Sequence, residues 1–345
     1  MVNSVDRDRF ASRQSACSED KVDIILPVAG LGSRLRPQTW SIPKPLVALA
    51  GKPMLEHVID RVRPLNPDRI IFITGYLGGQ IEKWAREELD IPVEFVVQPE
   101  MLGQTDAILR TRDLAHHDAL ILFPDALFET DFADLKSTTA DVVMLTKEID
   151  DPSSLGIAVV VNGKIVRLVE KPQELISRLA VIGIYYFKHM PDLFDAIDEQ
   201  MARGISLKNE YYIADAIQLM IGHGKTVVSS MVDFWEDCGN VEALLSTNRL
   251  LLDRHPKRAR LHGNSIIIEP CVVSEGVLLD RCVIGPYVSV SRGAEIIDSI
   301  VSDSIIDQGA KISHAIVDHS IVGRYAIVQG RAARLNVGET SMVNL

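Results

Sequence analysis

The sequence predicts an α/β protein in two parts, with a mostly parallel sheet first and a short parallel β-helix after it. Between residues 22 and 146, apolar segments of strand length alternate with segments of helical periodicity. This alternation favours a parallel sheet with helices on both faces. From residue 264 the helical periodicity ends, and residues 297–312 align with residues 313–328 at a period of 16. A short repeat of this kind favours coils that stack on one another.

The elements of the first part can be placed from their patterns. Apolar, β-branched runs predict strands at residues 22–28, 68–74, 93–97, 119–123, 142–146 and 181–187, with a further strand ending at Asp233. Apolar residues at helical spacing predict helices at residues 53–62, 79–89, 105–114, 191–202, 211–222 and 241–253. An Asn162-Gly163 turn predicts a hairpin of residues 157–161 and 165–169. Ligands of parallel sheets bind beyond the carboxyl ends of the strands, so we expect the functional residues there.

The repeat defines the second part. Ile284, Val290 and Ile296 recur every six residues, and roughly four coils fit between residues 265 and 330. Residues 1–20 carry Asp6, Asp8, Glu19 and Asp20 and lack an apolar core, so they are predicted to be a disordered extension rather than a signal peptide. The predicted division is an N-terminal extension of residues 1–20, a first domain of residues 21–255, a β-helix of residues 263–332 and a tail of residues 333–345.

Composition excludes several classes of function. The chain of 345 residues has a net charge of -11, which argues against a nucleic-acid-binding surface. No apolar run is long enough to span a membrane. The four cysteines, Cys17, Cys238, Cys271 and Cys282, have no Cys-x-x-Cys spacing, so we expect thiols in a reducing, cytoplasmic setting rather than a zinc site or disulfides.

The loop after the first strand has the composition of a phosphate-binding site. Gly30 and Gly32 place no Cβ between the backbone and a ligand, and Arg34 and Lys44 follow as cations. The loop is not a Walker A sequence, and Leu35 occupies the place of the third glycine of a dinucleotide fingerprint. Taken alone, the two glycines are equally typical of an ordinary strand-to-helix turn.

The stretch from Leu26 to Leu46 resembles the signature of the sugar-1-phosphate nucleotidylyltransferases, Gly-x-Gly-Ser/Thr-Arg-Leu-x-Pro-x-Thr followed by Pro-Lys-Pro. The resemblance covers about residues 22–332 and is greatest to long-form glucose-1-phosphate thymidylyltransferases. It implies a Rossmann-like nucleotidyltransferase domain and a left-handed β-helix of hexapeptide repeats. It also implies nucleotide contacts from the loop and catalytic charges after it, at Ala29, Gly30, Leu31, Gly32, Arg34 and Lys44. Leu31 departs from the family, which usually has a second glycine there.

Two aspartates are candidate ligands of Mg²⁺. Asp125 ends a buried strand, where it would either cap a turn or bind magnesium together with phosphate oxygens. The segment from Phe234 to Asn240 is similar to the family motif Trp-x-Asp-Thr/Ile-Gly, which implies that Asp237 is the second ligand. Glu236 is the competing carboxylate, and Asp237 could instead cap the helix that starts at Val241.

Other motifs imply contacts with the sugar and the base. A Glu-Lys-Pro motif implies that Glu170 binds sugar hydroxyls and that Lys171, also a catalytic residue, binds the sugar phosphate. Similar family motifs imply further sugar contacts from Gly156, Gly183 and Glu210. Each motif is short, and Glu210 could equally stabilise a helix N-terminus.

The base would be bound at Gln98 and Gly103, whose spacing is similar to that of family members that use UTP or dTTP. A glutamine amide both donates and accepts, so it can pair with a pyrimidine edge. Gln98 could instead be a polar strand end, and Gln104 replaces the small residue usual in the family.

The resemblance implies a reaction between a nucleoside triphosphate and a sugar 1-phosphate, with release of pyrophosphate. The attacking phosphate is already an anion, so no general base is required. The favoured substrates are dTTP, then UTP, with glucose 1-phosphate. Alternatives are a non-catalytic regulatory subunit and a bifunctional enzyme whose β-helix is an acyltransferase using His314 and His319. We also expect the β-helix to assemble copies of the chain into a homo-oligomer.

Overall fold

The computed structural model describes residues 22–132, 135–153, 155–254 and 259–330. The predicted extension of residues 1–20 and the predicted tail of residues 333–345 lie outside these ranges, as does Cys17. The described cysteines, Cys238, Cys271 and Cys282, are buried thiols, as their spacing predicts. No described helix has the length and apolarity needed to cross a lipid bilayer.

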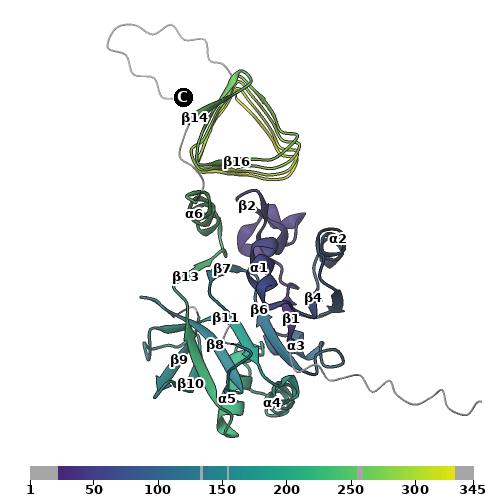
Figure 1. Ribbon diagram of the computed structural model, residues 1–345, viewed down its shortest axis with the longest axis vertical. Helices are drawn as coiled ribbons and strands as arrows, with labels where there is room; N and C mark the ends of the chain where they lie inside the picture. The colour runs from purple at the N-terminus through teal and green to yellow at the C-terminus, as the bar shows by residue number, and fades with distance from the viewer. Residues whose placement is uncertain (1–21, 133–134, 154, 255–258, 331–345) are drawn as a thin grey trace, which may run out of the picture.

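The first part of the chain forms a nine-stranded sheet with helices on both faces (Figure 1). Its strands, in order across the sheet, are β5 (Val93–Val97), β4 (Arg69–Thr74), β1 (Val22–Pro27), β6 (Asp118–Leu122), β11 (Leu179–Phe187), β8 (Val142–Glu148), β12 (Val227–Met231), β10 (Lys164–Glu170) and β9 (Gly156–Val161). The strands β5, β4, β1 and β6 are parallel, as predicted. Beyond them the sheet is mixed, because β11 runs antiparallel to both β6 and β8, and β9 and β10 form the predicted hairpin.

The helices follow the predicted order. They are α1 (Met54–Val62), α2 (Gly78–Glu88), α3 (Gln104–Leu109), α4 (Met190–Ala202), α5 (Ile213–Gly222) and α6 (Val241–Leu252). The prediction of a helix to residue 114 was wrong for α3, which ends at Leu109 and is followed by turns. The Thr111 hydroxyl donates to the Ile108 carbonyl at 2.7 Å, and this local bond competes with the helical ladder.

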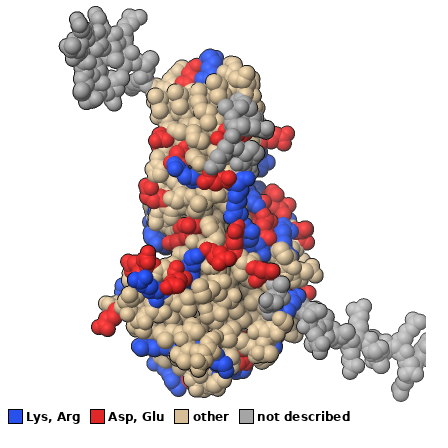
Figure 2. Space-filling view, turned by 60° about the vertical axis from the view of Figure 1, so that its left-hand side comes forward, with Lys and Arg blue, Asp and Glu red and all other residues tan. Residues whose placement is uncertain are grey.

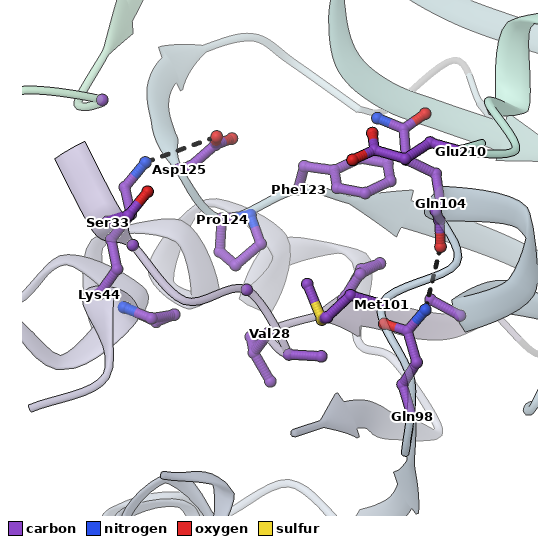
Figure 3. A pocket seen from close by; sticks show the side chains of 18 of the residues that line it. Val28, Ser33, Lys44, Gln98, Met101, Gln104, Phe123, Pro124, Asp125 and Glu210 are labelled. Atoms are coloured by element: carbon purple, nitrogen blue, oxygen red, sulfur yellow. Dashed lines mark hydrogen bonds and ion pairs between the residues drawn. The ribbon is translucent and has the colours of Figure 1, made fainter. Parts of the chain in front are cut away.

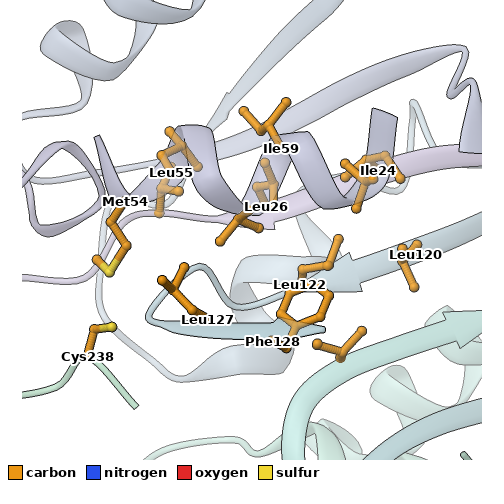
Figure 4. Close-up of a cluster of buried hydrophobic side chains, with 14 of the residues drawn as sticks. Ile24, Leu26, Met54, Leu55, Ile59, Leu120, Leu122, Leu127, Phe128 and Cys238 are labelled. Atoms are coloured by element: carbon orange, nitrogen blue, oxygen red, sulfur yellow. The ribbon is translucent and has the colours of Figure 1, made fainter. Parts of the chain in front are cut away.

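The core is divided by the sheet into two layers. Side chains alternate along β1, so that Ile24 and Leu26 enter one apolar cluster while Ile25 enters the other. Figure 4 shows the first cluster, in which α1 packs across β1 and β6 through Leu55 and Ile59. This packing fixes the ends of β1 and β6, from which the functional loops leave.

The α1 helix carries a partly buried histidine, His57, that should make stability depend on pH. The His57 ring contacts the Leu49 carbonyl at 2.8 Å, and burial lowers the pKa of His57 to about 4. The unfolded chain binds a proton at His57 near pH 6.5, and the folded chain binds it only near pH 4. The folded state is therefore fully stable with respect to this group above pH 6.5, and it loses stability as the pH falls to 4. Between pH 6.5 and pH 4, the protonation of His57 lowers the free energy of unfolding by about 3 kcal/mol.

We expect the variant His57→Gln to flatten the pH dependence of the unfolding free energy between pH 6.5 and 4. Guanidinium unfolding at pH 7, 5.5 and 4 measures it. An equal slope for the variant and the wild-type chain would show that His57 does not cause the acid sensitivity.

The second part of the chain is a parallel β-helix of four coils with three strands each, as the repeat predicts. Its strands are β15 (Ser265–Ile268), β16 (Cys271–Val273), β17 (Leu278–Asp280), β18 (Val283–Ile284), β19 (Val288–Val290), β20 (Glu295–Ile297), β21 (Ile300–Ser302), β22 (Ile305–Ile306), β23 (Lys311–Ser313), β24 (Ile316–Asp318), β25 (Ile321–Val322) and β26 (Ile327–Gln329). A further strand, β14 (Ala259–His262), pairs antiparallel with β15. Strand pairs such as Ile300 with Ile316 and Ile306 with Val322 confirm the period of 16.

One face of the β-helix, the sheet β16-β19-β22-β25, packs on the first part of the chain (Figure 1). In the first coil, Val272 lies so close to Gly51 that a Cβ on this glycine would collide with it. In the second coil, the Ser289 hydroxyl donates to the Asn248 side chain of α6 at 2.6 Å.

The third and fourth coils make their own contacts with the same side of the first part. Arg249 of α6 pairs with Asp303 at 2.7 Å, and Ile305 is part of the core cluster beneath α1. His319 lies between Glu242 of α6 at 2.9 Å and Asp303 at 2.7 Å, and these carboxylates raise its pKa. His319 therefore links the two parts of the chain.

Candidate active site

The predicted phosphate loop leaves the carboxyl end of β1, between the ends of its sheet neighbours β4 and β6. Gly32 has a φ of 61° and packs so tightly on Lys44 that a Cβ would lie 2.9 Å from the Cβ of that lysine. Gly30 has open space where its Cβ would be. The loop is thus anchored at Gly32 and open at Gly30, which leaves room for a ligand against the backbone.

This loop forms one wall of a cavity of about 430 Å³ (Figure 3). The cavity brings together ten of the predicted site residues, Ala29, Gly30, Gly32, Arg34, Lys44, Gln98, Gly103, Asp125, Lys171 and Glu210. Asp125 and Lys44 lie at one end, and Gln98, Gln104 and Met101 lie at the other. Charged groups therefore line both ends of the cavity, because Glu210 lies beside Gln104 at the second end, where the other labelled side chains are amide or apolar.

The two candidate metal ligands approach each other because two short strands pair. The strand β7 (Ala126–Glu129) directly follows Asp125, and it runs antiparallel to β13 (Phe234–Asp237) with Asp237 opposite Ala126. The Cys238 amide donates to the Asp125 carbonyl at 2.9 Å. Asp237 thereby lies beside Asp125, although it does not line the cavity itself.

The charges around this pair fit a divalent cation. Burial raises the pKa of Asp237, and the charge of Asp125 raises it further, while Lys44 and Arg34 oppose this shift. Lys44 lies 3.5 Å from the Asp125 carboxylate. Two carboxylates that repel each other are stabilised when a cation binds between them. The described residues include no cluster of three or more acidic, histidine or cysteine ligands, so phosphate oxygens would have to complete the coordination.

Gly239 keeps these charged groups close to one another. A Cβ on Gly239 would lie 2.9 Å from both carboxylate oxygens of Asp237 and 3.0 Å from the Arg34 guanidinium. The glycine also lines the cavity. Gly239 was not among the site residues predicted from the sequence, although it stands inside the Asp-Cys-Gly motif.

Lys171 is held by the hydroxyl of Tyr212, which was also not among the predicted site residues. The Lys171 ammonium donates to the Tyr212 hydroxyl at 2.9 Å, and this hydroxyl donates to Glu210 at 2.8 Å. Burial alone lowers the pKa of Lys171, but Tyr212, Glu170 and Glu210 outweigh it and raise the pKa. The lysine is therefore charged and held in the cavity wall.

If Lys171 binds the sugar phosphate, as the resemblance implies, Tyr212→Phe should raise the KM for this substrate about 10-fold, since Lys171 loses one charge-assisted hydrogen bond worth about 1.5 kcal/mol. The KM for the nucleoside triphosphate should change much less. Steady-state kinetics with each substrate varied in turn measures both values. A rise confined to the nucleotide KM would show that Lys171 does not serve the sugar phosphate.

At the other end of the cavity, Gln98 is buried and has fixed partners. Its amide nitrogen donates to the Gly103 carbonyl at 3.0 Å and to the Asp106 carboxylate at 2.9 Å. Gly103 has a φ of 114°, and a Cβ there would collide with the backbone of Tyr211. The glycine is thus required by the chain that packs on it as well as by its place in the cavity wall.

Besides Asp237, four predicted residues lie away from the cavity lining. Leu31 is exposed, and Gly156 faces the Glu170 carboxylate, whose pKa is raised by burial. The Gly183 carbonyl accepts from the Phe123 amide at 3.0 Å, and it is Phe123 that lines the cavity. Gly183 and Glu170 therefore contact residues of the cavity wall, Phe123 and Lys171, rather than the cavity itself.

The sequence has relatives throughout its two parts. The Nucleotidyl transferase family matches residues 22–254, and the family described as GlmU-like, C-terminal hexapeptide matches residues 249–333. A glucose-1-phosphate thymidylyltransferase of Streptomyces griseus is 28% identical over 92% of this chain and 97% of its own length. A probable mannose-1-phosphate guanylyltransferase of Oryza sativa subsp. japonica is 27% identical over 90% of this chain and 88% of its own length.

A solved structure has the same fold in the first part. A putative glucose-1-phosphate thymidylyltransferase from Bacillus anthracis, in complex with sucrose, has a TM-score of 0.61 and 25% identity. The match covers 69% of this chain and 98% of that chain.

Proposed function

Because the chain belongs to the Nucleotidyl transferase family and is a sugar-1-phosphate nucleotidylyltransferase, we propose that it joins dTTP or UTP to glucose 1-phosphate. The observation that carries the proposal is the meeting of Arg34, Lys44 and Asp125 in one cavity, with Asp237 beside them. Cations for a triphosphate and carboxylates for a metal are thereby placed together.

The proposed reaction is an in-line displacement at the α-phosphorus of the nucleotide. An oxygen of the sugar phosphate forms a bond to this phosphorus, and the bond to the bridging oxygen breaks, so that pyrophosphate leaves with the electron pair. Arg34 and Lys44 stabilise the negative charge that develops on the leaving group. Lys171 holds the sugar phosphate in line, which reduces the entropy cost of the encounter.

We propose that Asp125 and Asp237 hold Mg²⁺. Bound there, the metal would neutralise phosphate charge and orient the α-phosphate. Carboxylates complemented by phosphate oxygens are the coordination that magnesium takes on nucleotides. The residues themselves provide the binding site, and the Lys44 contact limits the repulsion between the two carboxylates while no cation is bound.

Pyrophosphate release tests the proposal. The chain is mixed with Mg²⁺ and glucose 1-phosphate, and dTTP, UTP, ATP, GTP and CTP are supplied one at a time. We expect pyrophosphate release with dTTP or UTP, and no release when the sugar phosphate is left out. Release with mannose 1-phosphate or a hexosamine 1-phosphate alone would correct the sugar. No release with any of these pairs would favour the regulatory-subunit alternative.

The β-helix offers little support for an acyltransferase. His319 is occupied by Glu242 and Asp303, and His314 lies at an exposed turn 3.6 Å from Asp298. Acetyl-coenzyme-A turnover would reverse this interpretation.

We propose instead that the β-helix joins a second copy of the chain. An exposed apolar row runs along the sheet β15-β18-β21-β24, in which Ile266, Val283, Ile300 and Ile316 are neighbours in register. Ile316 is 80% exposed. Rows of exposed isoleucine on a folded surface mark contacts between proteins.

The double variant Ile300→Lys, Ile316→Lys should therefore halve the mass in solution, as measured by light scattering. Leu278→Lys, at an exposed position on a different sheet of the β-helix, is the control and should leave the mass unchanged. A monomeric wild-type chain would rule out this assembly.

A further inference from the structure

The orientation of the Gln98 amide is fixed by the protein and not by a ligand. A primary amide has two N–H donors and one carbonyl acceptor. Both donors of Gln98 are used, since its nitrogen lies 3.0 Å from the Gly103 carbonyl and 2.9 Å from the Asp106 carboxylate. The opposite orientation would set the amide oxygen against two acceptors, so it is strongly disfavoured.

Asp106 is itself held in place. It is 3% exposed, and its second oxygen accepts from Arg110 one turn later at 2.7 Å. The carboxylate therefore bridges a partly exposed arginine and a buried glutamine. Because Asp106 lies outside the cavity lining, it acts on a ligand only through Gln98.

The remaining hydrogen-bonding group of Gln98 is its carbonyl oxygen. Gln98 is 5% exposed and lines the cavity, and Figure 3 shows its oxygen on the side of Met101, inside the pocket. The site thus presents an acceptor at this point and no donor from Gln98. A base bound here needs an N–H group on the edge that meets Gln98.

The bases divide into two classes by this criterion. Uracil and thymine carry N3–H, and guanine carries N1–H, whereas cytosine and adenine have a ring nitrogen lone pair at the same place. An oxygen that faces a lone pair repels it and leaves both acceptors unpaired. Cytosine could reach Gln98 only with its exocyclic amine, which would shift the base sideways relative to its ribose.

We propose that Asp106 is a positioning residue for base selection, which fixes Gln98 so that the site accepts bases with a ring N–H and rejects cytosine and adenine. The inference rests on the proposed function for the identity of the ligand, a nucleoside triphosphate. Gln98 contacts the ring N–H and not the 5-methyl group of thymine, so it contributes equally to the affinity for UTP and for dTTP.

Calorimetric binding of UTP, CTP and 3-methyl-UTP to the full chain in Mg²⁺ tests the inference without turnover. UTP should bind about 10- to 100-fold more tightly than CTP, and blocking N3 with a methyl group should cost a similar factor. Equal affinities for UTP and CTP would overturn the proposal. Discrimination in binding without pyrophosphate release would contradict the proposed function and leave the inference standing.

The variant Asp106→Asn addresses the positioning role. The asparagine can turn its amino group toward Gln98, which lets the glutamine amide rotate. We expect the UTP-to-CTP affinity ratio to fall at least about fivefold. A ratio equal to that of the wild-type chain, in a folded variant, would overturn the role of Asp106.

Two controls separate this effect from damage to the helix. Arg110→Met removes the outer ion pair but keeps the bond between Asp106 and Gln98, so its UTP-to-CTP ratio should match that of the wild-type chain. Asp113→Asn removes an exposed carboxylate after the same helix, and it should also preserve the ratio. If a substitution merely destabilised the helix, the affinities for UTP and CTP would fall by the same factor and their ratio would not change.

Discussion

The variant Asp125→Asn is expected to lower kcat about 1,000-fold, which corresponds to about 4 kcal/mol of transition-state stabilisation. Asparagine keeps the shape of the side chain and removes the charge that would hold Mg²⁺. Asp237 would then be the single carboxylate ligand at a metal site that is proposed to need two. Initial rates of pyrophosphate release over a range of Mg²⁺ concentrations measure the effect, and higher Mg²⁺ should restore only part of the rate.

Two neighbouring substitutions show whether the effect belongs to the metal site. Asp237→Asn should match Asp125→Asn, because the paired strands β7 and β13 place the two carboxylates together. Glu236→Gln, one residue earlier on the same strand, should retain most of the activity because its side chain leaves the strand on the other face. A larger loss in Glu236→Gln than in Asp237→Asn would reverse the assignment of the second ligand.

The variant Asn248→Ala is expected to destabilise the protein by about 3 kcal/mol. Asn248 is 1% exposed, and its side-chain oxygen accepts from the Ala50 amide at 2.9 Å and from the Ser289 hydroxyl at 2.6 Å. Its nitrogen donates to the Tyr287 carbonyl at 3.4 Å. Removal of the amide leaves buried polar groups unpaired on both sides of the junction between sheet and coils.

Thermal or guanidinium unfolding measures the loss, and Arg249→Ala is the matched control. Arg249 is the next residue of the same helix, but its pair with Asp303 is half-exposed and should contribute less than about 1 kcal/mol. Equal effects of the two substitutions would show that the buried amide is not the main link.

Strong local patterns made much of the fold predictable from the sequence. Local sequence alone encodes the apolar runs of β1, β4 and β6, the Asn162-Gly163 hairpin and the period of 16. The strand β7 has only four residues, too few for a clear periodicity, so the meeting of Asp125 and Asp237 could be assigned only by resemblance. Tyr212 and Asp106 could not be assigned, because their roles depend on contacts with Lys171 and Gln98 that no local pattern encodes.

Because one side of the β-helix packs along the first part of the chain, the number of coils in this protein cannot change freely during evolution. Solenoids usually gain or lose whole repeats easily, because each repeat touches only its neighbours. Here Val272, Ser289 and Asp303 meet the first part of the chain one coil after another. A duplicated coil inserted between them would move every later contact by one strand spacing, about 4.8 Å, and misalign it with α6. Repeats added at the far end of the stack would avoid this penalty, so natural variation in coil number should accumulate there.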